Sequence, residues 1–490
     1  MPRKPRYLRM DKDDLAWEKS DERVENWERS LHDAETYRGI ANLIIKYRPG
    51  EPVELHRPIR GGYNLLFRLE FKDGSSAAMR IPCKGIVKFP EEKVSYEVAT
   101  MRYVAAKTTI PVPRIYHHGT AMENPTGLGP FIIMDYVEHE RTMSDALNDP
   151  LLASGEPHAL NSNINEETLA FLYKQMANIV LQLSTLSFPR IGSLVQDERG
   201  RVRVSGRPLI QNMNSLVEFA GVPPALLPSQ QYLGSRQWYS AMADMHLAQA
   251  TFQRNDAVLD EDDARDKFVA RQLFRRLASS DRLATETDPG DGEGNQGAFR
   301  LYSEDLRPSN VLIDKNLCVV GVIDWEFAYA APAEFSLDPP WWLLLKSPEY
   351  WPGGYTPWME AYEPRFNIFL NALEQEEDEM RKSGRCLSDQ VPLSRRMRQS
   401  WETETWLINY AARNSWAFDF IFWKFIDPTY FGQNELGDHR ARLGLLAEHE
   451  LVAMENFVNM KTQELRTREL VEWDERDPGS DMAKMTKIMV

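Results

Sequence analysis

Hydrophobic and polar residues alternate along the stretch after residue 51, and this alternation predicts a small antiparallel sheet. The first strand places large apolar residues on one side: Leu65, Phe67, Leu69 and Phe71. Asp73-Gly74 follows as a hairpin signal, and residues 76–81 are expected to form the return strand. The apolar run at 131–134 has the length of a further strand.

Other segments repeat their apolar residues at the spacing of a helix. In the first fifty residues these positions are Leu15, Trp17, Val24, Trp27 and Leu31, which predicts a helical extension packed on the main body. A helix over 90–105 is predicted from Val94, Val98, Met101 and Ala105. Two longer helices are expected at 171–186 and 266–278.

These elements suggest an α+β chain in three parts. We expect a helical extension at 1–50, a β-rich lobe at 51–137 and a mainly helical lobe at 138–490. The stretch near 284–297 is rich in Gly, Asp and Pro and is expected to be a surface loop. Residues 299–326 should form a strand, a loop, a strand, a turn and a third strand.

Charge and composition narrow the classes of function. The net charge of −15 argues against a nucleic-acid binder, because affinity for the phosphate backbone comes from clustered Lys and Arg. The sequence contains no run of about 18 apolar residues, so we predict no membrane-spanning helix. The first residues are basic but soon become acidic, unlike a transit peptide. The three cysteines are scattered, so we expect no zinc site. Together these observations predict a cytoplasmic protein. The sequence does not indicate its oligomeric state.

The central segment contains the parts that phosphoryl transfer from ATP needs. Asp305 is followed after four residues by Asn310, and a predicted strand begins immediately afterwards. A turn leads into a second strand that ends at Asp324. Two adjacent strands joined by a tight turn bring these three side chains toward one point. A carboxylate can then orient a hydroxyl, while Asn and Asp oxygens suit Mg²⁺.

Asp305-Leu-Arg-Pro-Ser-Asn310 and the later Val-Ile-Asp324-Trp-Glu326 resemble the aminoglycoside phosphotransferase and choline kinase family. The resemblance implies a bilobal protein-kinase-like fold, with a small β-rich lobe and a large helical lobe. It also implies Asp305 as the catalytic base, Asn310 and Asp324 as Mg²⁺ ligands, ATP as the donor, and a hydroxyl of a small molecule as the acceptor.

The β-rich lobe offers positions for the nucleotide. Gly61 and Gly62, with Asn64 close behind, lie between two predicted strands, where backbone amides can approach phosphate. Arg80 occupies the strand position at which the kinase pattern has its lysine. Glu97 falls on or beside the inward stripe of the 90–105 helix, and Arg80 is its expected partner.

Residues 134–137 correspond to the kinase hinge, and the backbone of Asp135 and Val137 is expected to bind adenine. The tryptophan-rich region after Asp324 is expected to contact the acceptor, although tryptophans at helical spacing more often fill a core. Glu326 and Asp338 are either acids that face an amine-bearing acceptor or ordinary loop acids.

Two departures from the family pattern keep a second interpretation open. Ser303 stands where the family usually has a histidine, and the strand cation is Arg80 instead of lysine. A pseudokinase that binds nucleotide and acts through protein partners is therefore the alternative to an enzyme. A protein kinase is disfavoured, because Trp325-Glu326 replaces Phe-Gly after the metal-binding aspartate.

Overall fold

The computed structural model describes residues 12–31, 33–280, 282–283, 299–384, 391–471, 483 and 485–487. The chain divides into two compact units. The first is called here the sheet unit and consists of residues 23–209 and 299–403. The second, the helical unit, consists of residues 1–22, 210–298 and 404–490. The predicted boundaries at residues 50 and 137 stay predictions, and the predicted loop at 284–297 lies outside the described residues.

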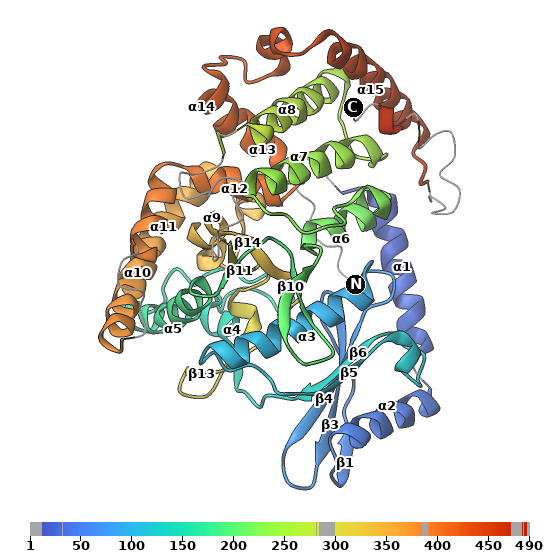
Figure 1. Cartoon of the computed structure of the whole chain (residues 1–490), viewed down its shortest axis with the longest axis vertical. Coiled ribbons are helices and arrows are strands. Elements are labelled where there is room, and N and C mark those ends of the chain that lie inside the picture. Colours follow the sequence, from blue (N-terminus) through green and yellow to red (C-terminus); the bar gives the residue numbers. More distant parts are fainter. Residues whose placement is uncertain are drawn as a thin grey trace. The chain divides into compact units, whose positions relative to one another are not determined.

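A six-stranded antiparallel sheet dominates the first part of the sheet unit (Figure 1). Its strands follow the order β1-β3-β4-β6-β5, and β2 pairs with β3. The strands are β1 (Pro52–Leu55), β2 (Ile59–Arg60), β3 (Asn64–Phe71), β4 (Ser76–Pro82), β5 (Ile115–Gly119) and β6 (Phe131–Asp135). Every second residue of β3 is buried, beginning at Leu65, which confirms the predicted alternation and its hairpin partner.

Two helices, α1 (Asp14–Ser30) and α2 (Ala34–Tyr47), lie where the sequence predicted helical structure; the extension as a separate part of the chain stays a prediction. One apolar core joins residues of both helices to one face of the sheet: Val24, Trp27, Leu31, Ile40, Leu43, Ile44, Leu65, Phe67, Leu69, Phe71, Met79 and Ile81. Residues of β3 and β4 alternate between the two faces, so Leu66, Ala78 and Arg80 point to the opposite side. The extension thus covers one face and leaves the other for the cavity described below.

The predicted helix at 90–105 is observed as α3 (Pro90–Lys107). Val94, Val98 and Met101 are buried as expected, and Glu97 is buried beside them. Ala105 is exposed, so this part of the prediction was wrong. It lies in the last turn of the helix, where Val104 already makes the buried contact.

The rest of the sheet unit is built on a helix pair, α5 (Glu166–Ser184) and α10 (Tyr355–Lys382), which lie side by side. The unit also contains three small antiparallel sheets, in the orders β14-β11-β8, β13-β12-β7 and β10-β9, the last of which packs on α3. Their strands are β7 (Arg141–Thr142), β8 (Ser187–Phe188), β9 (Ser193–Gln196), β10 (Val202–Gly206), β11 (Phe299–Ser303), β12 (Val311–Ile313), β13 (Val319–Val322) and β14 (Ala328–Pro332). Shorter helices complete the unit: α4 (Met143–Leu147), α9 (Ala333–Leu337) and α11 (Leu393–Glu402).

The helical unit contains only helices and connecting segments among its described residues. Besides the first turns of α1 it includes α6 (Gln211–Phe219), α7 (Ser235–Phe252), α8 (Glu261–Ser279), α12 (Thr405–Arg413), α13 (Phe418–Ile421), α14 (Asp427–Phe431) and α15 (Glu448–Thr467). The predicted helix at 266–278 is confirmed within α8. Trp406 and Trp416 fill the core of this unit, as the structural explanation of the tryptophans expected.

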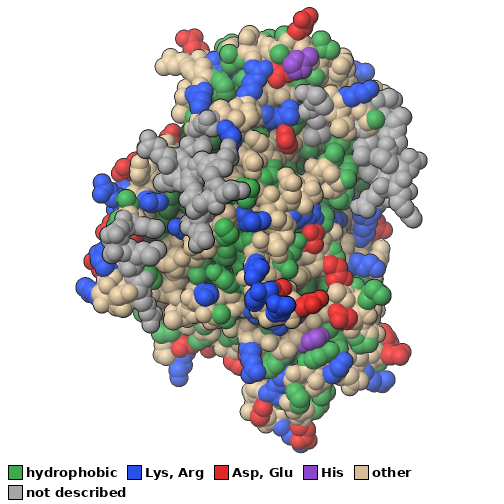
Figure 2. All heavy atoms as spheres, in the orientation of Figure 1, with side chains coloured by type: hydrophobic (Ala, Val, Ile, Leu, Met, Phe, Trp, Pro, Cys, Tyr) green, Lys and Arg blue, Asp and Glu red, His purple; other side chains and the backbone are tan. Residues whose placement is uncertain are grey.

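No helix among the described residues is long and apolar enough to cross a membrane. On the face shown in Figure 2, acidic and basic side chains are interspersed.

Candidate active site

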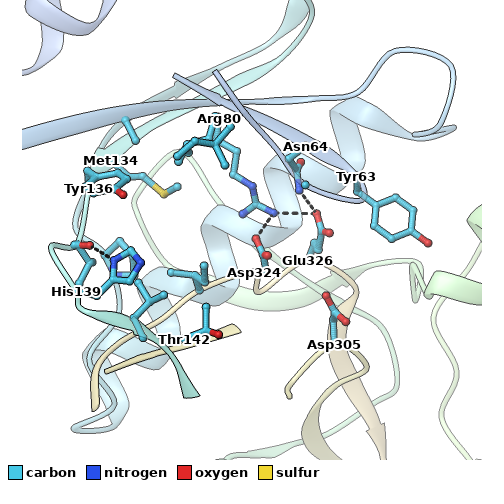
Figure 3. A pocket seen from close by; sticks show the side chains of 18 of the residues that line it. Tyr63, Asn64, Arg80, Met134, Tyr136, His139, Thr142, Asp305, Asp324 and Glu326 are labelled. Carbon is cyan, nitrogen blue, oxygen red and sulfur yellow. Dashed lines mark hydrogen bonds and ion pairs between the residues drawn. The ribbon is translucent and has the colours of Figure 1, made fainter. Parts of the chain in front are cut away.

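A cavity of about 320 Å³ lies on the free face of the large sheet, entirely within the sheet unit. Its walls come from β2 and β3, from β4, from the segment after β6, and from the loops after β11 and β13 (Figure 3). Its volume is in the range of small-molecule sites. The cavity has an apolar end and a charged end. Of the predicted site residues, Glu97 and Asn310 do not line it but contact residues that do, Arg80 and Asp305.

The apolar end is formed by aliphatic side chains from both sides of the cavity: Leu66, Ala78, Met134, Leu312 and Ile323. The predicted hinge residues Asp135 and Val137 line it. The N–H of Asp135 donates to the carbonyl oxygen of Arg114 at 2.9 Å. The backbone N–H of Val137 has no acceptor among the described residues, so it can serve a planar ligand between these walls.

The charged end is centred on Arg80, which β4 presents to the cavity. Its guanidinium forms the predicted ion pair with Glu97 of α3, and both side chains are buried. The same guanidinium contacts Asp324 Oδ1 at 2.7 Å and Glu326 Oε2 at 2.9 Å (Figure 3). One arginine therefore holds three carboxylates, and its planar fork of donors makes this possible.

A second buried cation, Lys93 of α3, was not predicted. Its ammonium group forms an ion pair with Glu326 and donates to Asn64 Oδ1 at 2.6 Å. The Asn64 amide nitrogen in turn donates to Glu326 Oε2 at 2.8 Å. The available signal was its position four residues before Glu97, on the same side of the helix. Its partner, Glu326, is far along the chain, so spacing alone could not identify the pair.

Glu326 is not an ordinary loop acid, which was one of the two possibilities that the sequence left open. It is 2% exposed and lies inside this charge network. Burial opposes its ionisation, yet Lys93 and then Arg80 outweigh that effect and lower the pKa of Glu326. Asp338 is also buried and accepts from the Ser400 hydroxyl at 3.2 Å. Ser400 belongs to α11, so the Asp338 carboxylate ties that helix to the loop after α9.

Asp305 lies in the loop after β11 and borders the charged end. The amide nitrogen of Asn310 donates to its Oδ2 at 2.9 Å and to its backbone carbonyl at 2.8 Å. Arg307 Nε lies 2.9 Å from the other carboxylate oxygen. Burial, opposed by Arg307, raises the pKa of Asp305 to about 6. The carboxylate is thus basic enough to accept a proton and still ionised at neutral pH.

Asp324 follows β13, and the predicted β12–β13 hairpin is observed. Its backbone has a φ of +58°, a left-handed conformation uncommon for residues with a side chain. Trp325 anchors the turn, because its buried ring donates from Nε1 to the Val322 carbonyl at 2.9 Å. Strained backbone of this kind persists where surrounding structure holds it and is concentrated at functional sites.

Gly61 and Gly62 lie at the cavity beside Tyr63, in the connection between β2 and β3. A Cβ added to Gly62 would meet no atom within 4 Å, and one added to Gly61 would meet only the Asn64 carbonyl at 3.5 Å. The protein's own packing therefore does not require glycine here, and the predicted contact of this backbone with phosphate stays a prediction.

Comparison with known families adds evidence from the sequence itself. Residues 200–378 match the phosphotransferase enzyme family. The matched range contains Asp305, Asn310, Asp324 and Glu326, whereas Arg80 on β4 and the helix α3 lie outside it. The roles of the sheet and of α3 therefore rest on the structure.

Curated relatives correct one expectation. "Altered inheritance of mitochondria protein 9, mitochondrial" from Clavispora lusitaniae is 23% identical over 302 residues, 56% of this chain and 47% of that protein. "Subtelomeric hrmA-associated cluster protein" from Aspergillus fumigatus is 29% identical over 134 residues, 27% of this chain and 23% of that protein. The chain spans less than half the length of these relatives. The predicted cytoplasmic location is wrong, since several relatives are named as mitochondrial proteins.

Similar solved structures include Plasmodium vivax ethanolamine kinase, with a TM-score of 0.39 and 12% identity, covering 92% of this chain and 94% of that one. Another is macrolide 2'-phosphotransferase type I, with a TM-score of 0.36 and 14% identity, covering 78% and 93%. Residues 200–378 therefore resemble the phosphotransferase enzyme family, and the α+β fold agrees with the expected protein-kinase-like class.

Proposed function

We propose that this protein transfers the γ-phosphoryl group of ATP, with Mg²⁺, to a hydroxyl group of a small molecule. The observation that carries the proposal is one cavity with an apolar hinge end and a charged end that holds Arg80, Asp305 and Asp324. The apolar end suits a purine ring, and the hinge backbone supplies a donor for its edge. The charged end suits a polyphosphate with its metal.

The residues present fit Mg²⁺. Asn310 uses its amide nitrogen to hold Asp305, which leaves its carbonyl oxygen for a metal. Asp324 adds a charged oxygen from the next loop. No group of three or more His, Cys, Asp or Glu side chains among the described residues forms a metal cage. Mg²⁺ commonly binds through one or two protein oxygens and substrate phosphates, where it neutralises charge on the β- and γ-phosphates.

In the proposed reaction the ionised Asp305 accepts a hydrogen bond from the acceptor hydroxyl and orients its oxygen toward the γ-phosphorus. The new P–O bond forms as the bond to the β-phosphate oxygen breaks, and ADP leaves with that electron pair. The hydroxyl proton passes to Asp305 and then to solvent. Asn310 and Arg307 fix the carboxylate for this role.

The experiment that tests this role is Asp305→Ala, assayed for ATP-dependent phosphorylation of a panel of hydroxyl-bearing acceptors. We expect turnover to fall by about a hundredfold or more, because a positioned base contributes that much. ATP affinity should be retained, since Asp305 lies opposite the hinge. Asp149→Ala, in the connection after α4, is the control and should keep full activity. Unchanged turnover in Asp305→Ala would exclude the assigned role.

A second candidate is a nucleotide-binding pseudokinase that acts through protein partners. The observation that favours it is the engagement of Arg80 with three carboxylates, one of which is the proposed metal ligand Asp324. ATP binding without transfer to any acceptor would support this alternative. The names of the curated relatives favour a mitochondrial setting for either function.

A further inference from the structure

Lys93 occupies an unusual place for a lysine. Its side chain is 1% exposed and lies in the first turns of α3, one helical turn before Glu97. A buried ammonium group is costly unless it is paired and hydrogen-bonded. Glu326 and Asn64 satisfy it, and both of these residues line the cavity whereas Lys93 does not. Among the residues that line the cavity, Lys93 contacts these two neighbours.

The charges around Arg80 are unevenly shared. Glu97, Asp324 and Glu326 all contact Arg80. Of these three carboxylates, Lys93 pairs with Glu326. Without Lys93, a single guanidinium would be the counter-charge for three carboxylates. An arginine held in this way resists transfer to another anion, because Glu97 or Glu326, both buried, would lose its cation.

We propose that Lys93 is a positioning residue that keeps Glu326 neutralised, so that Arg80 can turn from the carboxylates to the phosphates of a nucleotide. This inference rests on the proposed function. In this arrangement Asp324 exchanges Arg80 for the metal, Arg80 keeps Glu97 and gains phosphate, and Glu326 keeps Lys93. Asn64 joins Glu326 and Lys93 from β3 and holds both in place.

The test is binding of ATP with Mg²⁺, measured by calorimetry without any acceptor. Lys93→Met removes the charge and keeps the length of the side chain. We expect its Kd to rise at least about tenfold, since Arg80 must then stay with all three carboxylates. Lys107→Met, at the exposed end of the same helix, is the matched control and should bind as the wild type does.

The double variant Lys93→Met/Glu326→Gln removes one charge of each sign. It returns Arg80 to two carboxylates, so we expect its Kd to lie within about threefold of the wild-type value. Recovery in the double variant separates positioning from a structural role, which would lower the melting temperature and leave the Kd of the folded protein unchanged. If Lys93→Met does not fold, the double variant alone decides, and a tenfold loss in it overturns the inference.

The outcomes distinguish the two proposals. Wild-type protein that binds ATP, with an equal Kd in Lys93→Met, overturns the inference and leaves the proposed function intact. Wild-type and Lys107→Met proteins that both fail to bind ATP overturn the proposed function and this inference with it.

Discussion

Two buried arginines, one in each unit, show how differently the same side chain can be used. In the helical unit Arg271 is fully buried and pairs with one carboxylate, Asp419. Its remaining donors reach the carbonyl oxygens of His246 and Lys267 and the side chain of Gln249. In the sheet unit Arg80 borders a cavity and contacts three carboxylates.

The difference lies in charge balance and access. Around Arg271 each donor has an acceptor and the charges cancel, so the cluster has nothing left to offer a ligand. Around Arg80 the three carboxylates exceed the two cations, and Asp324 is 30% exposed at the cavity. A surplus of negative charge at an accessible site attracts a metal ion, whereas a balanced and sealed cluster holds a fold together.

The largest expected effect comes from breaking the sealed cluster. Asp419→Asn leaves the Arg271 charge buried without a counter-charge and should lower the free energy of unfolding by about 3–5 kcal/mol. Chemical unfolding measures the change. Arg275 lies on the same helix as Arg271 and forms a surface ion pair with Asp244 of α7. Arg275→Met should lower the free energy of unfolding by less than about 1 kcal/mol. Equal losses in the two variants would contradict the distinction.

Acidification should also lower the free energy of unfolding through the Arg271 cluster, and this effect should be somewhat smaller. Burial, reinforced by the charge of Arg271, lowers the pKa of His246 from 6.5 to about 3. Between these two values the unfolded chain takes up a proton that the folded protein refuses. Stability is therefore full above about pH 6.5 and falls as the pH drops. The contribution of His246 amounts to a loss of about 2 kcal/mol at pH 5 relative to pH 7.

The measurement is unfolding free energy against pH for the wild type and for His246→Gln. The variant should show a shallower decline below pH 6.5. His449→Gln, an exposed position in the same unit, controls for the loss of a histidine. A decline as steep in His246→Gln as in the wild type would rule out this source of acid sensitivity.

The smallest expected effect on stability comes from the cluster around Arg80. Asp324→Asn removes a negative charge from the cluster around Arg80, where three carboxylates already outnumber two cations, so the melting temperature should change little. The rise in melting temperature with ATP should no longer depend on Mg²⁺, with an affinity loss of about tenfold in the presence of the metal. Asp378→Asn, exposed on α10, should keep the metal dependence. Metal dependence that persists in Asp324→Asn would remove Asp324 from the proposed ligands.

The parts of the site that sequence could predict are those fixed by local spacing. Asp305, Asn310 and Asp324 lie on two loops joined by one hairpin, so strand pattern and separation were sufficient to bring them together. The Arg80–Glu97 pair was accessible because a strand and the next helix restrict which faces can meet. The roles predicted for these residues stay predictions.

Contacts between residues far apart in the sequence could not be predicted from local spacing. Lys93 and Glu326 are each unremarkable in their own segment, and only the folded chain makes them partners. The same limit applies to the two units. The periodicity of α8 predicts a helix, but it does not tell which distant segments share its core. Local patterns also gave no warning of the β9–β10 hairpin within the region expected to be helical.

The division of the chain has a consequence for its synthesis. The helical unit is drawn from three separate stretches, and the sheet unit is complete once residue 403 has been made. During translation the second stretch of the helical unit must wait for α12 to α15 before it can bury its apolar faces. Domains generally fold as units from the N-terminus onward, and waiting segments expose apolar surface. The apolar faces of α6, α7 and α8 therefore stay uncovered during synthesis until α12 to α15 have been made.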